Sequence, residues 1–87
     1  MSWSVILSKQ ALKDLSKLRR ARLISNAQSL LQVLEQNPFA KYPRYEKLVG
    51  NLTGYYSRRI NIQHRLIYSV DQENKIVHVL RMWSHYE

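Results

Sequence analysis

The stretch YYSRRINIQHRLIYSVDQENKIVHVLRMW (residues 55–83) decides the fold, because it holds three extended segments with short connections. The segments are rich in aromatic and β-branched residues, which favour strands, and they span residues 55–60, 65–70 and 76–83. Their links, residues 61–64 and 71–75, are short enough for hairpins but not for crossovers. The stretch therefore predicts three consecutive antiparallel strands.

Upstream of this stretch the pattern predicts one strand and two helices. Residues 3–7 alternate between apolar and polar types, as a short first strand does. Ser8 can cap a helix, and a second helix ends at Asn37 because Pro38 restricts the residue before it. The apolar stripes of the two helices consist of Ala11, Leu12, Leu15 and Leu18, and of Leu23, Ala27, Leu30, Leu31 and Leu34.

The predicted element order is β-α-α-β-β-β, an α+β fold in which a two-helix hairpin packs on one face of a four-stranded antiparallel sheet. Residues 39–49 are expected to form a loop or an irregular strand, since Pro43 argues against a central strand. A chain of 87 residues predicts one domain, residues 1–87. The sheet face without helices would be free to act as the working surface.

Composition points to a polyanionic or acidic partner. Fourteen Lys and Arg against six Asp and Glu give a formal charge of +8, which favours nucleic acid, an acidic protein or an anionic membrane. The absence of Cys excludes disulfides and thiolate metal sites. The absence of Cys also fits a reducing cytosol. The N-terminus has no signal-peptide pattern and no apolar run approaches a transmembrane span, so neither a signal peptide nor a transmembrane helix is predicted.

The first helix and the joint after it carry an excess of positive charge. Two interpretations stay open, a solvated helix face and a surface that contacts phosphates. The residues concerned are Lys9, Lys13, Lys17, Arg19, Arg20 and Arg22.

One carboxylate stands alone in the basic, Tyr-rich part of the chain. Between Glu35 and Asp71 the only acidic residue is Glu46, and six Lys or Arg lie between positions 41 and 65. An enzyme that cuts a polyanion needs cations to hold the phosphates and a base to move a proton, so Glu46 is the candidate base. The alternative is a surface Glu without a function.

Cleaving RNA without a metal also requires an acid, for which imidazole is suited near neutral pH. His64 lies beside a turn, where it can equally serve as a capping residue. His78 lies mid-strand and is interpreted as structural, whereas His85 lies just past the last strand and is the better candidate. No metal site is predicted, because the histidines are scattered and carboxylates are few.

Four arginines are candidates for clamping phosphate, which Arg does bidentately: Arg58, Arg59, Arg65 and Arg81. Tyr86 could stack on an unpaired base. For the strand residues Tyr55, Tyr56 and Tyr68, packing is the favoured interpretation over stacking.

The run YEKLVGNLTGYYSRRINIQHRLIYSVD (residues 45–71) and the ending RMWSHYE (residues 81–87) closely resemble the Txe/YoeB toxins of the RelE superfamily. An NPF after the second helix extends the resemblance over nearly the whole chain. The specific elements are E-x-L, NL-x-G, SRRI, HRL-x-Y and a terminal HY. The resemblance implies a microbial-ribonuclease-like RelE fold and a bacterial type II toxin that cuts mRNA in the ribosomal A site.

The resemblance also implies roles for individual residues. Glu46 would be the general base on the 2′-OH and His85 the general acid. Arg65 would stabilise the transition-state phosphate, with help from Arg59. Tyr86 would orient the substrate. The implied RNA-binding residues are Arg59, Lys47, Arg58 and Arg81. The product would end in a 2′,3′-cyclic phosphate or a 3′-phosphate, and no cofactor would be needed.

The implied partners are the 70S ribosome with its mRNA and a cognate YefM/Axe-like antitoxin with an acidic C-terminal segment, in the bacterial cytoplasm and not at a membrane. A homodimer is compatible with the resemblance. Some members carry a Lys three residues after the catalytic Glu, where this chain has Val49, so the contribution of Lys47 is open. Two other functions remain as alternatives, a ParE-like inhibitor of DNA gyrase on the same fold and a basic RNA-binding module.

Overall fold

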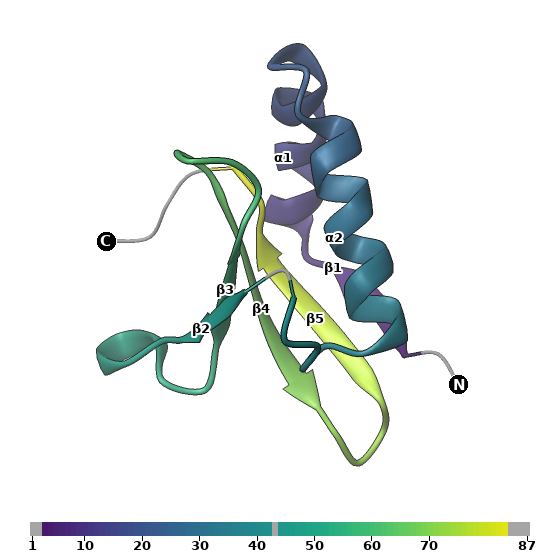
Figure 1. Ribbon diagram of the computed structural model, residues 1–87, viewed down its shortest axis with the longest axis vertical. Coiled ribbons are helices and arrows are strands. Elements are labelled where there is room, and N and C mark those ends of the chain that lie inside the picture. Colours follow the sequence, from purple (N-terminus) through teal and green to yellow (C-terminus); the bar gives the residue numbers. More distant parts are fainter. Residues whose placement is uncertain (1–2, 43, 84–87) are drawn as a thin grey trace.

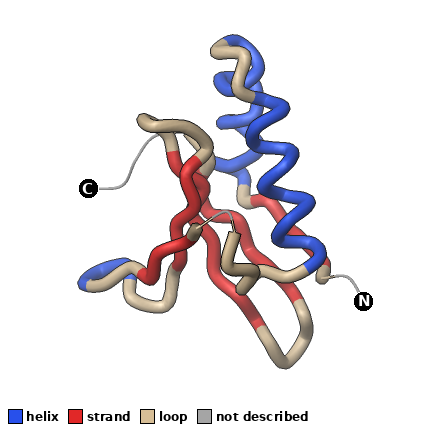
Figure 2. The backbone as a smooth tube through the Cα atoms, viewed as in Figure 1, coloured by secondary structure: helices blue, strands red, loops and turns tan. Residues whose placement is uncertain are grey.

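The computed structural model describes residues 3–42 and 44–83. Within these residues two α-helices lie on one side of a twisted five-stranded sheet (Figure 1; Figure 2). The strands are β1 (Ser4–Leu7), β2 (Tyr45–Lys47), β3 (Tyr56–Arg59), β4 (Arg65–Asp71) and β5 (Ile76–Arg81). The helices are α1 (Lys9–Arg20), α2 (Ile24–Gln36) and the short 3₁₀ helix η1 (Gly50–Leu52).

The helical hairpin begins and ends at the predicted residues. The Ser8 hydroxyl accepts a hydrogen bond from the Ala11 N–H at 3.0 Å, which caps α1, and it donates one to the Leu80 carbonyl at 2.7 Å. α2 ends at Gln36, and Asn37 is its C-cap residue, directly before Pro38. Among the described residues, no helix is long and apolar enough to cross a membrane.

The core lies between the helices and one face of the sheet. The predicted stripes supply the helical side with Ala11, Leu18, Ala27, Leu30 and Leu34. The sheet side consists of alternating residues of the strands, Leu66, Tyr68, Val77 and Val79, with Val5 and Leu7 of β1 and the preceding Trp3 packed against them. Among the described residues, no α-helix covers the opposite face of the sheet, as predicted (Figure 2).

The α+β class is confirmed, but two details of the sheet differ from the prediction. The strand order is β1-β5-β4-β3-β2, with β2 as a fifth strand pairing antiparallel with β3. β1 pairs with β5 in parallel, so the sheet is mixed. The short links in the sequence predict antiparallel pairing only between strands that follow one another along the chain. The helical hairpin instead carries the chain away after β1, which leaves β1 beside the last strand.

Arg58 is buried, which overturns its prediction as an RNA-binding residue. Its side chain is 1% exposed and donates hydrogen bonds to the carbonyls of Pro38 (2.9 Å) and Ala40 (3.0 Å). Its Nε also donates to the Tyr68 hydroxyl at 3.0 Å, and the Tyr68 hydroxyl donates to the Pro38 carbonyl at 2.9 Å. The guanidinium therefore ties β3 to the segment after α2, and it cannot reach a ligand on the open face.

Candidate active site

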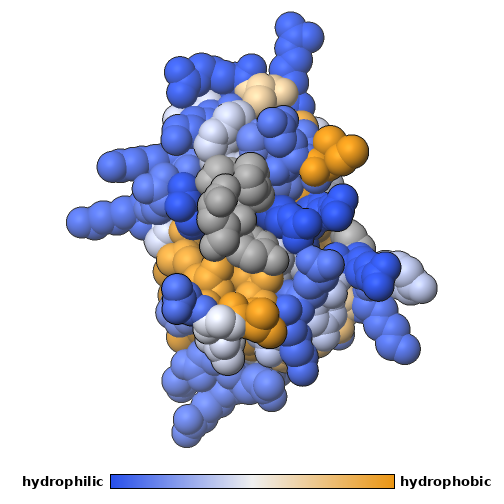
Figure 3. Space-filling view, turned by 90° about the vertical axis from the view of Figure 1, so that its left-hand side faces the viewer, coloured by the Kyte–Doolittle hydropathy of each residue, from blue (hydrophilic) through white to orange (hydrophobic). Residues whose placement is uncertain are grey.

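A pocket of about 330 Å³ lies on the face of the sheet that the helices leave open. Its described lining residues are Arg44, Glu46, Ser57, Arg59 and Arg65. The volume is within the range of small-ligand sites, and the lining is mainly charged. Hydrophilic side chains dominate the side of the molecule seen in Figure 3, with a larger apolar area below the centre and a smaller, separate one at the upper right.

Strand register brings these residues together. Glu46 of β2 lies opposite Ser57 of β3, and Arg59 of β3 lies opposite Arg65 of β4. Side chains alternate along a strand, so Ser57 and Arg59 share one face while Arg58 faces the core between them. Three neighbouring strands therefore present one carboxylate, one hydroxyl and two guanidinium groups on the same surface.

Glu46 and Arg65 form an ion pair at the pocket. Arg65 Nη1 lies 2.8 Å from Glu46 Oε1, with side-chain exposures of 22% and 55%. The same Nη1 lies 3.5 Å from the Oγ of Ser57, which is buried. The pair is 19 residues apart in sequence, so the sheet and not local chain geometry sets its distance. Because both side chains are partly exposed, an incoming anion can compete with the carboxylate for the guanidinium.

The charge balance of the pocket suits a phosphate better than a cation. Three arginines line it together with one carboxylate. Arginine binds phosphate oxygens through pairs of parallel N–H bonds. In residues 3–42 and 44–83 no group of three His, Cys, Asp or Glu side chains is placed to hold a metal ion.

The other predicted site residues are not all in the pocket. Lys47 lies opposite Tyr56, which packs against the core, so it belongs to the opposite face of the sheet from Glu46. Arg81 is exposed at the end of β5 and is not among the described residues that line the pocket. His85 and Tyr86 lie outside the described residues.

The two described histidines have different surroundings. His64 stacks on Trp83, with ring centroids 4.0 Å apart and an interplanar angle of 18°. His78 is exposed on the open face and lines a separate pocket of about 120 Å³ with Ile6, Tyr55 and Leu80. It is therefore not a core residue, although its position in mid-strand suggested a structural role.

Sequence reasoning missed two pocket residues, Arg44 and Ser57. Arg44 was missed because the adjacent Pro43 argues against a strand at this position. Arg44 and Glu46 are two residues apart, and in a strand this spacing places both side chains on one face. Ser57 carries no charge and has no signal of its own. It could be found only from its position between the aromatic start of β3 and Arg59.

Comparison with known proteins gives the family. Residues 7–86 match the family described as the YoeB-like toxin of bacterial type II toxin–antitoxin systems. Toxin YoeB of Synechocystis sp. is 34% identical over 56 residues, which are 64% of this chain and 65% of that protein. The aligned part thus spans just under two thirds of the length of this relative.

Solved structures agree with the sequence match. A YoeB/ParE toxin from Agrobacterium tumefaciens superposes with a TM-score of 0.85 at 28% identity, covering 95% of this chain and 99% of that one. YoeB of Staphylococcus aureus, in a heterotetrameric complex with YefM, superposes with a TM-score of 0.79 at 33% identity, covering 97% and 98%. The same S. aureus toxin is also known as a dimer. From its sequence and its fold, this chain belongs to the YoeB-like toxins of bacterial type II toxin–antitoxin systems.

Proposed function

We propose that this toxin is a ribosome-dependent mRNA endonuclease that cuts mRNA in the A site and so inhibits translation. The observation that carries the proposal is the Glu46–Arg65 pair in a pocket whose other described charged residues are arginines. A base beside cations that can hold a phosphate is what cleavage through the 2′-OH requires.

In the proposed reaction Glu46 removes the proton from a ribose 2′-OH. The 2′-oxygen then attacks the adjacent phosphorus, and the bond to the 5′-oxygen of the next nucleotide breaks. Arg65, Arg59 and Arg44 stabilise the negative charge that grows on the phosphoryl oxygens. His85 donates a proton to the departing 5′-oxygen, and Tyr86 orients the substrate. The products are a 2′,3′-cyclic phosphate, which can open to a 3′-phosphate, and a 5′-hydroxyl.

The proposed partners follow from charge and from the family. Cationic docking on ribosomal RNA and mRNA fits the charge of +8. The S. aureus relative is bound to YefM, and we infer a YefM-like antitoxin with an acidic C-terminal segment for this chain as well. A homodimer, as in the S. aureus relative, and a location in the bacterial cytoplasm complete the proposal.

The test is cleavage of a defined mRNA on programmed bacterial ribosomes, mapped by primer extension. We expect a cut in the A-site codon for the unaltered toxin, and a loss of about 10²–10⁴-fold in rate for Glu46→Gln and for His85→Ala. Glu35→Gln is the matched control, because Glu35 is an exposed residue of α2 outside the pocket. This control should cleave as fast as the unaltered toxin.

Uncut mRNA with the unaltered toxin would overturn the proposal. A supercoiling assay would then test the alternative, inhibition of DNA gyrase, which the name of the A. tumefaciens relative as a YoeB/ParE toxin brings forward. Glu46 separates the two functions, since an inhibitor that only binds gyrase does not need a general base.

A further inference from the structure

His64 lies face to face with Trp83 at the end of the sheet where β5 finishes. The ring centroids are 4.0 Å apart and the planes are inclined by 18°. Both residues are partly buried. The Nδ1 atom of His64 is buried and has no hydrogen-bond partner among the described residues. The contact that this ring makes is therefore one of stacking.

The β3–β4 turn holds the backbone of His64 in place. The Asn61 side-chain oxygen accepts hydrogen bonds from the N–H groups of His64 (2.7 Å) and Gln63 (2.8 Å). The His64 carbonyl accepts a bond from the N–H of Ile60 at 2.8 Å. Four residues thus close a tight turn, and the imidazole projects from a fixed position.

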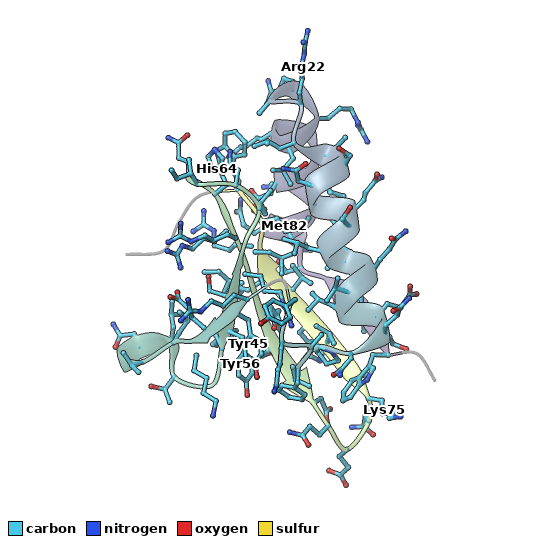
Figure 4. All side chains as sticks on the ribbon, viewed as in Figure 1. Arg22, Tyr45, Tyr56, His64, Lys75 and Met82 are labelled. Atoms are coloured by element: carbon cyan, nitrogen blue, oxygen red, sulfur yellow. The ribbon has the colours of Figure 1, made fainter. Side chains whose placement is uncertain are left out.

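The chain that leaves β5 is held on its other side by a buried carboxylate. The Met82 N–H donates a hydrogen bond to Asp14 Oδ2 at 2.9 Å, and both Met82 and Asp14 are fully buried. Figure 4 shows His64 and Met82 at the same end of the molecule, far from Lys75 at the opposite end of β5. Trp83 is therefore fixed by Asp14 through the preceding residue and by His64 through its own ring.

This double fixation bears on the reaction because of what lies next to each partner in the sequence. His85 follows Trp83 by two residues, a length of chain that spans at most about 7 Å. Arg65 directly follows His64 and pairs with Glu46. The stack therefore links Trp83, two residues before the proposed acid His85, to His64, the residue directly before the phosphate-binding Arg65.

We infer that His64 is a positioning residue for cleavage: its stack on Trp83 fixes the last described residue before His85, two positions away in the sequence. The inference rests on the proposed function, because it takes His85 as the general acid. It assigns no proton transfer to His64. A misplacement of about 1 Å at a reacting group can cost about 10²-fold in rate, which is the scale of the effect.

Two substitutions separate stacking from imidazole chemistry. In His64→Ala the stack is lost, and we expect single-turnover cleavage on programmed ribosomes to fall about 10- to 100-fold with unchanged half-saturation. In His64→Phe the ring is kept and the unpaired nitrogen is removed, so we expect cleavage within about threefold of the unaltered toxin. The control is Gln63→Ala, an exposed residue of the same turn, which should cleave normally.

A double substitution tests whether His64 acts through His85. If it does, His64→Ala should slow the His85→Ala toxin no further, because the group that it positions is already gone. Thermal unfolding of each variant separates this result from loss of the fold. A further drop of 10-fold or more in a folded double variant would overturn the inference, as would equal losses in His64→Ala and His64→Phe.

The two proposals fail in different ways. If His85→Ala cleaves at the normal rate, the assignment of the acid falls, and the role of His64 falls with it. If His85→Ala is slow but His64→Ala is as fast as the unaltered toxin, only the positioning role is overturned and the proposed function stands.

Discussion

Arg58 and Arg59 are adjacent in the sequence but belong to opposite faces of the sheet. Arg58 is buried and donates hydrogen bonds to two carbonyls and to the Tyr68 hydroxyl. Its guanidinium carbon lies 4.9 Å from the centre of the Tyr45 ring. Burial of Tyr68, opposed in part by Arg58, raises the pKa of its phenol, which keeps the hydroxyl neutral and able to donate to Pro38. Arg59 is exposed and lines the pocket.

We expect Arg58→Lys to destabilise the fold and Arg59→Lys to spare it. An ammonium cannot reproduce a planar, multidentate and stacked contact, and each hydrogen bond to a charged group contributes about 1.5–3 kcal/mol. Urea unfolding should therefore show a loss of at least about 1.5 kcal/mol for Arg58→Lys and less than about 0.5 kcal/mol for Arg59→Lys. Equal stability of the two variants would contradict the assignment of Arg58 to the core.

Arg44 should matter for cleavage, whereas Lys47 should not. Arg44 lines the pocket with Glu46, and Lys47 lies on the other face of β2. Removing one charge-assisted phosphate contact should slow cleavage about tenfold, so we expect this loss for Arg44→Ala. Lys47→Ala is the matched control and should stay within about twofold. A larger loss in Lys47→Ala would show that the substrate passes over the edge of β2.

For individual residues, the sequence predicts which side chains point to opposite faces of a strand better than it predicts which of the two faces is the core. The period of two separates Arg58 from Arg59, but it does not say which of them faces the core, and both are plausible phosphate ligands by type. The lone acid Glu46 could be singled out because no other carboxylate competes with it between Glu35 and Asp71. Its distance to Arg65 depends on the pairing of three strands, which no local pattern encodes.

At the scale of elements, the start of α1 ties the helical layer to the sheet. Ser8 caps the helix and also donates to the Leu80 carbonyl at 2.7 Å. We expect Ser8→Ala to lower the free energy of unfolding by about 1–2 kcal/mol. For a domain of this size each kcal/mol corresponds to a drop of roughly 4–8 °C in Tm. The control is Ser16→Ala, because the exposed Ser16 hydroxyl donates to the Lys13 carbonyl within α1, and the Tm of this variant should hardly change. Equal drops in both variants would contradict the cap.

The helices and the three consecutive strands β3, β4 and β5 were predictable because each has strong local signals: apolar stripes, a Ser cap, a Pro stop and short hairpin links. β2 was not, since it has only three residues and follows Pro43. The parallel pairing of β1 with β5 joins residues that are 72 apart in sequence, such as Ser4 and Ile76. Such contacts depend on where the helical hairpin packs, and not on any pattern within the strands themselves.

For the molecule as a whole, basic residues that contribute to the net charge of +8 lie on both sides of the sheet. Arg44, Arg59 and Arg65 line the pocket on the open face. Lys13, Arg19 and Arg20 are exposed on α1, which packs on the other face. Basic residues in the last turn of α1 also interact favourably with the carbonyl end of the helix. This second role gives the α1 charges a reason to be present without any phosphate contact.

The salt dependence of binding distinguishes the two sides. On single-stranded nucleic acid each neutralised phosphate adds about −0.7 to the slope of log affinity against log salt. Three pocket arginines therefore predict a slope near −2, or roughly a 20-fold loss of affinity between 50 and 200 mM salt for a short, uncleavable RNA with 2′-deoxy substitution. Arg44→Ala/Arg59→Ala should flatten this slope by about 1.4, whereas Lys13→Gln/Arg19→Gln/Arg20→Gln should leave it unchanged. A flatter slope in the α1 variant would mean that the RNA path continues from the pocket over the helical face, so that the whole charge of the molecule acts in binding.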